Sequence, residues 1–350
     1  MLALSLASVG CVKFERAYSS GRYANSQRRL ERTTESESAD GFEQYATASD
    51  IRFFLDTLCN ITIFASNAGK ANELLTKTFE LLAHYESLFS ITIEGSDIWR
   101  INHAGSLPVA VSTETIELLE AGIKYSKLSS RKFDITIGRL TRLWDFSGQS
   151  SLPDELSLSQ AIASVGYKNI VIDGETVTLT NPYTWIDLGG IAKGFMLDRL
   201  AGFLRSTEIY GAVIDLGGDI IVIGEREAGR KWRLGVRNPF GSEYGLIGII
   251  KTSEASVITS GIYERQFEYE GVSYHHILDP STGMPARSDI VSATVVSESA
   301  LAADALTSIA LHLYSDDAYE LLRSMPEVIG AILVLQDGRI IEIGNIDFTQ

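Results

Sequence analysis

Hydrophobic and polar positions follow regular patterns from about residue 51 onward. The runs 53–55 and 58–64 are rich in large apolar residues and predict a pair of strands. In 71–89, apolar side chains recur three and four positions apart, which predicts an amphipathic helix. Residues 113–128 repeat that spacing after a serine or threonine cap, so we expect a second helix of the same kind.

Further along the chain, predicted strands come in runs with helices between them. Residues 167–180 alternate as a hairpin around the turn 173–175. Additional strands are predicted at 211–223, 231–237, 245–251, 272–278 and 290–297, followed by a helix at about 299–314 and a hairpin around Asp337 and Gly338. This order predicts an α+β fold with mostly antiparallel sheets and flanking helices.

One short sequence occurs twice. Ile-Asp-Leu-Gly-Gly stands at 186–190 and again at 214–218. The repeat predicts that two strands end in the same turn. A coincidence between two strand-to-turn junctions is the alternative.

Residues 1–50 lack the periodicity of the rest. Residues 1–10 are apolar or small, and 12–50 are polar. The apolar run is too short to span a bilayer, which takes about 20 residues. Gly10 and Cys11 resemble the cleavage and lipidation site of bacterial lipoproteins. We therefore expect a signal remnant, a lipoprotein-like anchor and a polar tether, and export to the bacterial periplasm or its membrane. A disordered cytosolic extension with an incidental cysteine is the alternative.

Composition and charge exclude several classes of protein. With 45% hydrophobic and 21% charged residues, the chain is predicted to be soluble and globular. Its 30 basic and 45 acidic residues give a formal net charge of −15, which argues against a nucleic-acid partner. Cys11 and Cys59 are too few for a zinc knuckle or a disulfide framework, and Cys59 is expected to be a buried thiol. Sequences typical of P-loop NTPases, Rossmann dehydrogenases, HExxH proteases and GxSxG hydrolases are absent.

The first candidate for chemistry is the glycine turn at Gly189 and Gly190, followed by Lys193 at the start of a predicted helix. Free backbone N–H groups and the helix dipole at such a position favour an anion, and phosphate is the natural one. A tight turn with a solvated lysine is the alternative.

The second candidate combines 259–265 with 274–283, where hydroxyls, an arginine, two histidines and an Asp-Pro turn lie close in sequence. His276 is a candidate general base because the ordinary pKa of histidine lies near neutrality. A histidine that only completes local hydrogen bonds is the alternative.

The third candidate is the pair Asp304 and Ser308 within an otherwise apolar helix. A spacing of four places both side chains on one face, and their oxygens suit Mg²⁺ together with a substrate phosphate. An acidic residue that stabilises the helix N-terminus beside a small packing face is the alternative.

Taken together, these residues resemble the ApbE family of FAD:protein FMN transferases. Order and spacing agree from roughly Asp56 to Leu313. The matching positions are Ser90, 96–98, 101–102, 133–136, Gly138, 143–144, 187–194, 259–261, 263–265, 276–280, 282–283 and 303–306.

The resemblance implies an enzyme that transfers phosphorus-containing groups. With Mg²⁺ it would cleave FAD, attach FMN to a threonine hydroxyl of an acceptor flavoprotein and release AMP. It also implies a T-fold-like domain over 51–350 with the active site between two subdomains. Family members are typically exported, many of them as lipoproteins, which agrees with the expectation for Cys11.

Roles for individual residues follow from the family pattern. The metal would lie between the carbonyl of Gly190 and the side chains of Asp304 and Ser308, a serine where the family usually has threonine. His276 would deprotonate the incoming hydroxyl, and Asp304 would share in catalysis. The residues implied in flavin nucleotide binding are Leu55, Thr92, Lys132, Phe133, Asp134, Asp187, Lys193 and Leu278.

Two other functions keep the same site. A Mg²⁺-dependent FAD pyrophosphatase would use water as the acceptor, and Thr92 leaves this open because the family commonly has a larger aromatic residue there. A flavin-binding lipoprotein without turnover is the other alternative. It has no need of a base such as His276 or a metal ligand such as Asp304, which speaks against it.

Overall fold

The computed structural model describes residues 34–35, 45–144, 146, 151–225, 230–241 and 245–350, which belong to the unit Glu31–Gln350. Cys11 and most of the predicted anchor and tether lie outside the described residues. Among the helices described, none is both long and apolar enough to cross a membrane.

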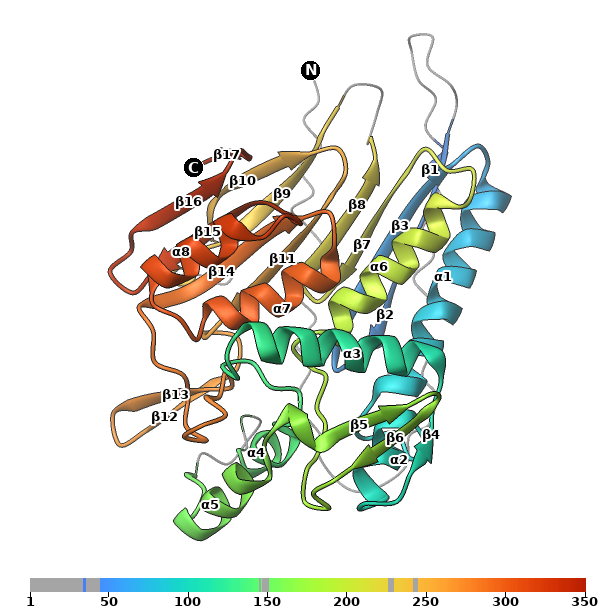
Figure 1. Cartoon of the computed structure of the whole chain (residues 1–350). Helices are drawn as coiled ribbons and strands as arrows, with labels where there is room; N and C mark the ends of the chain where they lie inside the picture. Colours follow the sequence, from blue (N-terminus) through green and yellow to red (C-terminus); the bar gives the residue numbers. More distant parts are fainter. Residues whose placement is uncertain (1–33, 36–44, 145, 147–150, 226–229, 242–244) are drawn as a thin grey trace. The chain divides into compact units, whose positions relative to one another are not determined.

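The central element is a sheet of nine strands in the order β1-β2-β3-β7-β8-β11-β14-β15-β16, and every neighbouring pair is antiparallel (Figure 1). This confirms the predicted α+β class. The strands are β1 (Thr34–Glu35), β2 (Ala46–Phe54), β3 (Thr57–Ala65), β7 (Gly211–Leu216), β8 (Asp219–Gly224), β11 (Ala255–Gly261), β14 (Ile290–Ser297), β15 (Val328–Leu335) and β16 (Ile340–Gly344).

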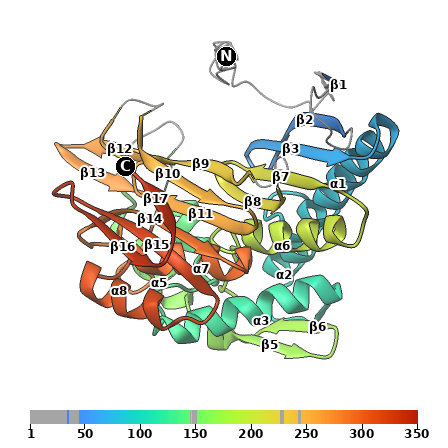
Figure 2. The same ribbon diagram turned by 90° about the horizontal axis from the view of Figure 1, so that it is seen from above.

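Helices cover one face of this sheet, and a small three-stranded sheet covers part of the other (Figure 2). All residues of β14 are buried because that strand lies between these two layers. The helices are α1 (Ala68–Phe89), α6 (Ala192–Arg205), α7 (Ala300–Ala310) and α8 (Ser315–Ser324), and the small sheet comprises β9 (Trp232–Arg237), β10 (Leu246–Thr252) and β17 (Asp347–Thr349).

The remaining elements lie beyond one end of the strands (Figure 1). An aromatic and aliphatic cluster joins α4, α5 and the β12–β13 hairpin, and the indole of Trp144 donates to the carbonyl of Gly283 at 2.9 Å. The elements are α2 (Asp97–His103), β4 (Val109–Ala110), α3 (Thr113–Leu128), α4 (Gly138–Leu143), α5 (Glu155–Ser164), a 3-10 turn (Tyr167–Asn169), β5 (Ile170–Asp173), β6 (Thr176–Leu179), β12 (Gln266–Tyr269) and β13 (Val272–His275).

Several local predictions are confirmed. The predicted strand pair is β2 and β3, although β2 begins at Ala46, inside the predicted tether, and not at residue 53. A tight turn joins the two strands, in which Leu55 and Asp56 both have positive φ, the geometry of a type I′ hairpin. Helix α3 has the predicted bounds, and the side chain of Ser112 accepts from the Thr115 N–H. Cys59 is buried, and burial raises the pKa of its thiol to about 12.

Other local predictions are wrong. The strand predicted at 211–223 is the hairpin β7–β8, because Gly217 and Gly218 adopt positive φ and reverse the chain. The helix predicted at 299–314 ends at Ala310, and the separate helix α8 follows. Strand β11, which the sequence interpretation treated as a polar cluster, lies inside the large sheet.

The repeated Ile-Asp-Leu-Gly-Gly sequence does not end two strands. Only the second copy ends one, β7, while the first directly follows an isolated bridge between Trp185 and Ile137. In both copies the aspartate nevertheless accepts from a glycine N–H of the turn, although from different glycines of the pair. Asp187 accepts from the Gly189 N–H at 2.9 Å, and Asp215 accepts from the Gly218 N–H at 2.7 Å. The repeat therefore encodes a carboxylate-stabilised turn.

Candidate active site

The site is built around a close crossing of helices α6 and α7 at Gly194. A Cβ atom on Gly194 would lie 2.3 Å from the backbone oxygen of Ala300 and 2.7 Å from Cβ of Asp304. The Gly194 N–H donates to Oδ2 of Asp304 at 2.8 Å. Because Gly194 has no side chain, α7 can lie close enough to α6 for the Gly194 N–H to hold the carboxylate of Asp304, the predicted metal ligand.

Asp198 lies on α6 one turn after Gly194, and its hydrogen bonds link α6 to the N-terminus of α7. Its carboxylate accepts from the Ser299 hydroxyl at 2.9 Å, from the Ala300 N–H at 2.8 Å and from the Leu301 N–H at 3.1 Å. These donors are unsatisfied at a helix N-terminus, so Asp198 completes the cap. The sequence interpretation did not identify this residue.

The three predicted metal-binding residues meet at this crossing. A Cβ on Gly190 would lie 3.3 Å from the Ser308 hydroxyl, which stands one turn after Asp304 on α7. Asp304 is buried, and among the described residues only Gly194 donates to its carboxylate. Burial, and then the charge of Asp219, raise the pKa of Asp304. An under-satisfied carboxylate with nearby neutral oxygens fits a hard cation such as Mg²⁺.

Lys193 is held by Asp219, a buried residue that directly follows the second Gly-Gly pair. The ammonium of Lys193 forms an ion pair with Oδ2 of Asp219, whose other oxygen accepts from the Thr259 N–H at 3.3 Å. Burial alone would lower the pKa of Lys193, but the charges of Asp219 and Asp304 outweigh it and raise that pKa. The sequence interpretation missed Asp219, although its place after the repeated turn was a usable signal.

We expect Asp219→Asn to lower the free energy of unfolding by about 3 kcal/mol, because it leaves a largely buried ammonium without its charged partner. Since the folded-state pKa of Lys193 is raised, the ion pair's contribution is fully present at pH 7 and lost only under alkaline conditions. Chemical denaturation measures the change. Asp337→Asn is the control, because Asp337 pairs with Arg339 on the surface. A loss no larger for Asp219→Asn than for the control contradicts the prediction.

His276 stands directly after β13. Its ring Nδ1 faces the carbonyl of Arg265 at 3.3 Å, and its backbone N–H donates to the same oxygen at 3.0 Å. With Nδ1–H directed at that carbonyl, Nε2 carries the free lone pair that a base requires. Burial, followed by the positive charge of Arg265, lowers the pKa of His276 to about 4. The ring is therefore neutral at pH 7.

His312 follows helix α7 and faces the segment after His276. Its Nδ1 lies 2.8 Å from the carbonyl oxygen of Ser308, and its Nε2 lies 3.0 Å from that of Leu278. The side chain of Leu278 is buried in the cluster around Trp144. The role of Leu278 in nucleotide binding remains a prediction, since its side chain lies in this cluster and its carbonyl faces His312.

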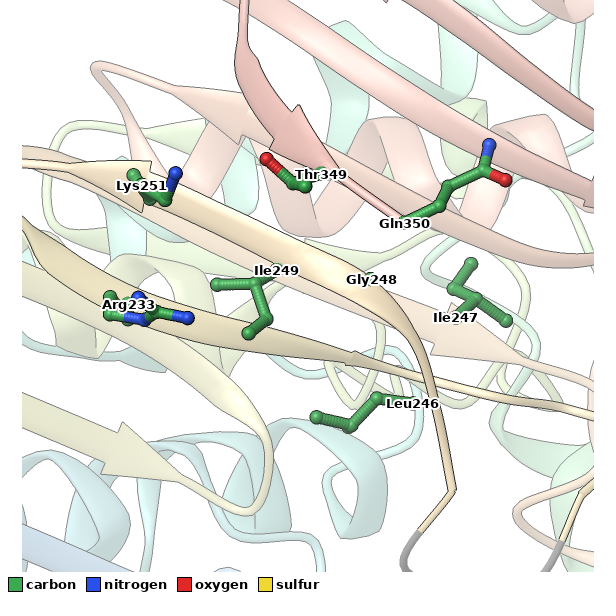
Figure 3. Close-up of a pocket in the computed structure, with 8 residues that line it drawn as sticks. All are labelled: Arg233, Leu246, Ile247, Gly248, Ile249, Lys251, Thr349 and Gln350. Atoms are coloured by element: carbon green, nitrogen blue, oxygen red, sulfur yellow. The ribbon is translucent and has the colours of Figure 1, made fainter. Parts of the chain in front are cut away.

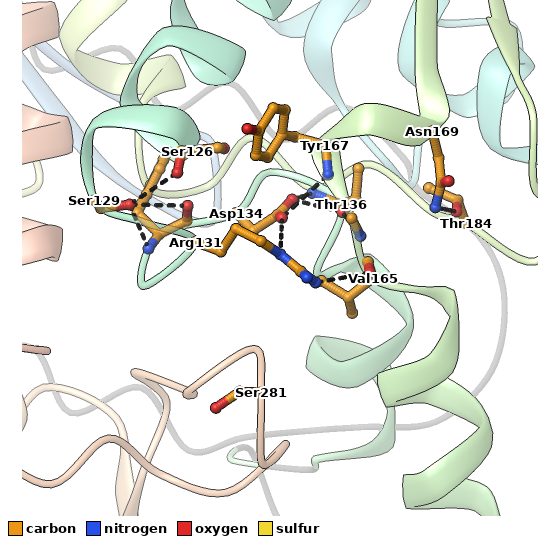
Figure 4. A network of polar contacts seen from close by, with 12 residues as sticks. Ser126, Ser129, Arg131, Asp134, Thr136, Val165, Tyr167, Asn169, Thr184 and Ser281 are labelled. Carbon is orange, nitrogen blue, oxygen red and sulfur yellow. Dashed lines mark hydrogen bonds and ion pairs between the residues drawn. The ribbon is translucent and has the colours of Figure 1, made fainter.

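Asp134 organises the loop that carries Lys132 and Phe133 (Figure 4). Its carboxylate accepts from the N–H and hydroxyl of Thr136 and from the Tyr167 N–H, so its oxygens are engaged by protein donors. The loop places Phe133 against Gly190, where a Cβ would lie 3.0 Å from the ring.

Lys132 and Asp187, two further residues predicted to bind the nucleotide, form hydrogen bonds between neighbouring segments. Lys132 donates to Oδ2 of Asp279 at 3.2 Å, which ties the Phe133 loop to the segment after His276. Asp187 accepts from the hydroxyl of Thr141 on α4 at 2.7 Å. Both therefore position the loops at this end of the sheet.

Leu55 and Thr92 form their hydrogen bonds with neighbours other than the residues around Gly190. The N–H of Leu55 donates to Glu86 at 2.7 Å, and the exposed Thr92 shares a hydrogen bond with Ser90 at 3.1 Å. Their roles in nucleotide binding remain predictions.

A surface groove of about 370 Å³ lies elsewhere, on the small sheet (Figure 3). It contains none of the predicted site residues. Its lining residues are Arg233, Leu246, Ile247, Gly248, Ile249, Lys251, Thr349 and Gln350.

Comparisons with known proteins agree with one another on the family of the chain. The model of the ApbE family matches residues 55–333. An FAD:protein FMN transferase of Klebsiella pneumoniae is 35% identical over 273 residues, which cover 77% of this chain and 84% of that protein. One from Treponema pallidum is 31% identical over 304 residues, with 82% and 84% covered.

Solved structures agree as well. The crystal structure of an ApbE protein from Thermotoga maritima superposes with a TM-score of 0.76 at 33% identity, over 86% of this chain and 97% of that one. The flavin transferase ApbE from Vibrio cholerae gives a TM-score of 0.75 at 26% identity, with 85% and 96% covered. With the family model and these relatives in agreement over most of its length, the chain belongs to the ApbE family.

Proposed function

We propose that this chain is a Mg²⁺-dependent FAD:protein FMN transferase that attaches FMN to a threonine hydroxyl of an acceptor flavoprotein and releases AMP. The observation that carries the proposal is the α6–α7 crossing. There the under-satisfied carboxylate of Asp304 stands with Ser308, Gly190 and the ammonium of Lys193. The names of the relatives support the same reaction.

In this reaction the residues of the site would have separate roles: metal binding, binding of the phosphates and positioning of Lys193. Gly190, Asp304 and Ser308 would hold Mg²⁺, which when bound neutralises charge on the pyrophosphate. Lys193 adds a positive charge next to this position, and the exposed Gly189 leaves its turn open to a phosphate. Asp219 keeps the ammonium of Lys193 charged and in place.

His276 supplies the base. Its Nε2 takes the proton of the threonine hydroxyl as that oxygen attacks the phosphorus of the FMN half. The bond between that phosphorus and the bridging oxygen breaks, and AMP leaves with the oxygen. His312 lies between the segment after His276 and helix α7. Its ring nitrogens face the carbonyls of Leu278 and Ser308, and in its neutral form it donates to one of them.

Incubation of the full chain with FAD, Mg²⁺ and a flavoprotein acceptor tests the proposal. We expect a fluorescent acceptor band that survives denaturing electrophoresis, with AMP formed in equal amount. An acceptor with valine in place of its threonine is the control and should stay unlabelled. AMP and FMN without a labelled acceptor would indicate the pyrophosphatase, and absence of AMP would indicate binding alone.

Transfer is expected to be constant from neutral pH down to about pH 5 and to decline below it, because His276 acts only in its neutral form and burial lowers its pKa to about 4. The measurement is kcat/KM for the acceptor as a function of pH. His276→Ala should abolish transfer, whereas the same change at the exposed His84 should leave the profile unchanged. An inflection near pH 6.5 would contradict the effect of burial.

We also propose that the part of residues 1–50 that precedes β1 anchors and tethers an exported catalytic domain through a lipid on Cys11. The support is the sequence pattern at Gly10 and Cys11. Mass spectrometry of the native N-terminal peptide tests this directly. A diacylglycerol-modified Cys11 is the expected result, and an unmodified residue within a longer peptide would contradict it.

A further inference from the structure

Three segments that are distant in sequence bring aromatic rings and two guanidinium groups together beside α4. Two residues come from α2, two from α4 and two from the segment that precedes Asp187. We call this group the arginine–aromatic patch. Its members are Trp99, His103, Arg139, Arg142, Tyr183 and Trp185.

Trp185 is the centre of the patch. The guanidinium carbon of Arg142 lies 4.6 Å from the Trp185 ring centroid, and that of Arg139 lies 5.5 Å from it. The His103 ring is 5.2 Å away and stacks in turn on Trp99 at 4.0 Å. The carbonyl of Trp185 accepts from the Gly138 N–H at 3.0 Å, which fixes α4 against it. Two cations are thus held over an aromatic surface.

The two arginines have no carboxylate partner among the described residues. Arg139 Nε is buried without a hydrogen-bond acceptor, and Arg142 is exposed. Arg100, which lies on α2, instead pairs with Asp97. In a chain with a net charge of −15, two adjacent unpaired guanidiniums retain donors for carboxylates that come from outside.

The patch adjoins the candidate active site. Thr141 lies between the two arginines on α4 and donates to Asp187 at 2.7 Å, and Asp187 leads directly into the Gly189–Gly190 turn. Tyr183, which is 64% exposed, marks the outer side of the patch. The helix that carries the two arginines is therefore joined to this turn through the Thr141–Asp187 hydrogen bond.

We propose that the arginine–aromatic patch docks an acidic surface of the acceptor flavoprotein. The inference rests on the proposed function, and it adds a specificity surface separate from the groups that bind FAD. Carboxylates fit the planar N–H edges of guanidiniums that stack on an indole. Such charge complementarity acts chiefly on encounter with the partner and on its selection.

The test is acceptor kinetics of the double variant Arg139→Gln/Arg142→Gln. We expect kcat/KM for the protein acceptor to fall about tenfold at low salt, through KM, while KM for FAD is unchanged. The difference from wild type should disappear at about 0.5 M salt, where exposed charges are screened. Arg233→Gln, at an exposed arginine on β9, is the matched control and should behave as wild type.

Two further variants separate docking from folding. Arg142→Lys keeps the charge but loses the planar donor edge, so its acceptor affinity should lie between wild type and the glutamine variant. Arg142→Glu should lose more than the glutamine variant. An acceptor whose surface carboxylates are replaced by lysine should partly restore the rate of Arg142→Glu. Binding of the acceptor is also measured by fluorescence anisotropy without FAD, so a failure of catalysis does not conceal the result.

The inference is overturned if a folded double variant binds and labels the acceptor as wild type does. It is equally overturned if KM for FAD rises while KM for the acceptor does not. That result would indicate that the arginines contact the nucleotide. Failure of wild type to label any acceptor that it binds would count against the proposed function alone.

Discussion

Asp304→Asn is expected to lower FMN transfer by about a thousandfold or more, because the variant loses the only carboxylate among the three predicted metal-binding residues. An asparagine oxygen still accepts from the Gly194 N–H, so the crossing of α6 and α7 is preserved. Without Mg²⁺ the variant should be at least as stable as wild type, since burial raises the pKa of Asp304 and makes its ionised form unfavourable. Single-turnover transfer, Mg²⁺ titration and melting temperature measure these effects.

Asp316→Asn is the control for this change. Asp316 is an exposed acidic residue in the first turn of the neighbouring helix α8, and its replacement should affect neither transfer nor Mg²⁺ dependence. Full Mg²⁺-dependent activity of the Asp304 variant would remove this residue from the metal site.

The second large effect is expected for Gly194→Ala. The added methyl would lie 2.3 Å from the backbone oxygen of Ala300, and a backbone atom of a capped helix cannot move aside as a flexible side chain can. We expect the free energy of unfolding to fall by about 3 kcal/mol as the two helices separate. Transfer should fall sharply even where the variant folds, because the separation displaces Asp304 from the Gly194 N–H and from Lys193.

Gly202→Ala on the same helix is the matched control. A Cβ at Gly202 meets no atom within 4 Å, so this substitution should stabilise the protein by up to about 1 kcal/mol through helix propensity. Denaturation and single-turnover transfer of both variants form the comparison. Equal behaviour of the two alanine variants would show that the close approach at Gly194 has no role.

Local sequence predicted much of the secondary structure and several of the site residues. The strand pair before and after Leu55 and the helix after Ser112 were predictable because each depends on a spacing and a turn or cap within a few residues. Lys193, His276 and Asp304 became candidates for a similar reason. Each is a reactive side chain in a short motif of suitable residue types.

Contacts between distant segments were not predictable in this way. Asp219 bonds Lys193 across 26 positions, His312 bonds Leu278 across 34, and Asp198 bonds Ser299 across 101. Asp198 and His312 belong to no recognisable motif, and Asp219 is marked only by its place after the repeated turn. Their importance depends on which strands pair and which helices cross.

By itself, the sequence determined the antiparallel α+β class, the family pattern and the types of group available for chemistry, because these depend on short-range spacing and side-chain identity. The tertiary structure decided how those groups act. Packing of α6 on α7 at Gly194 fixes the position of the Asp304 carboxylate through the Gly194 N–H. Pairing of β8 in the sheet buries Asp219 beside Lys193. Burial then sets the charge of each group, since desolvation and neighbouring charges exist only once distant segments have come together.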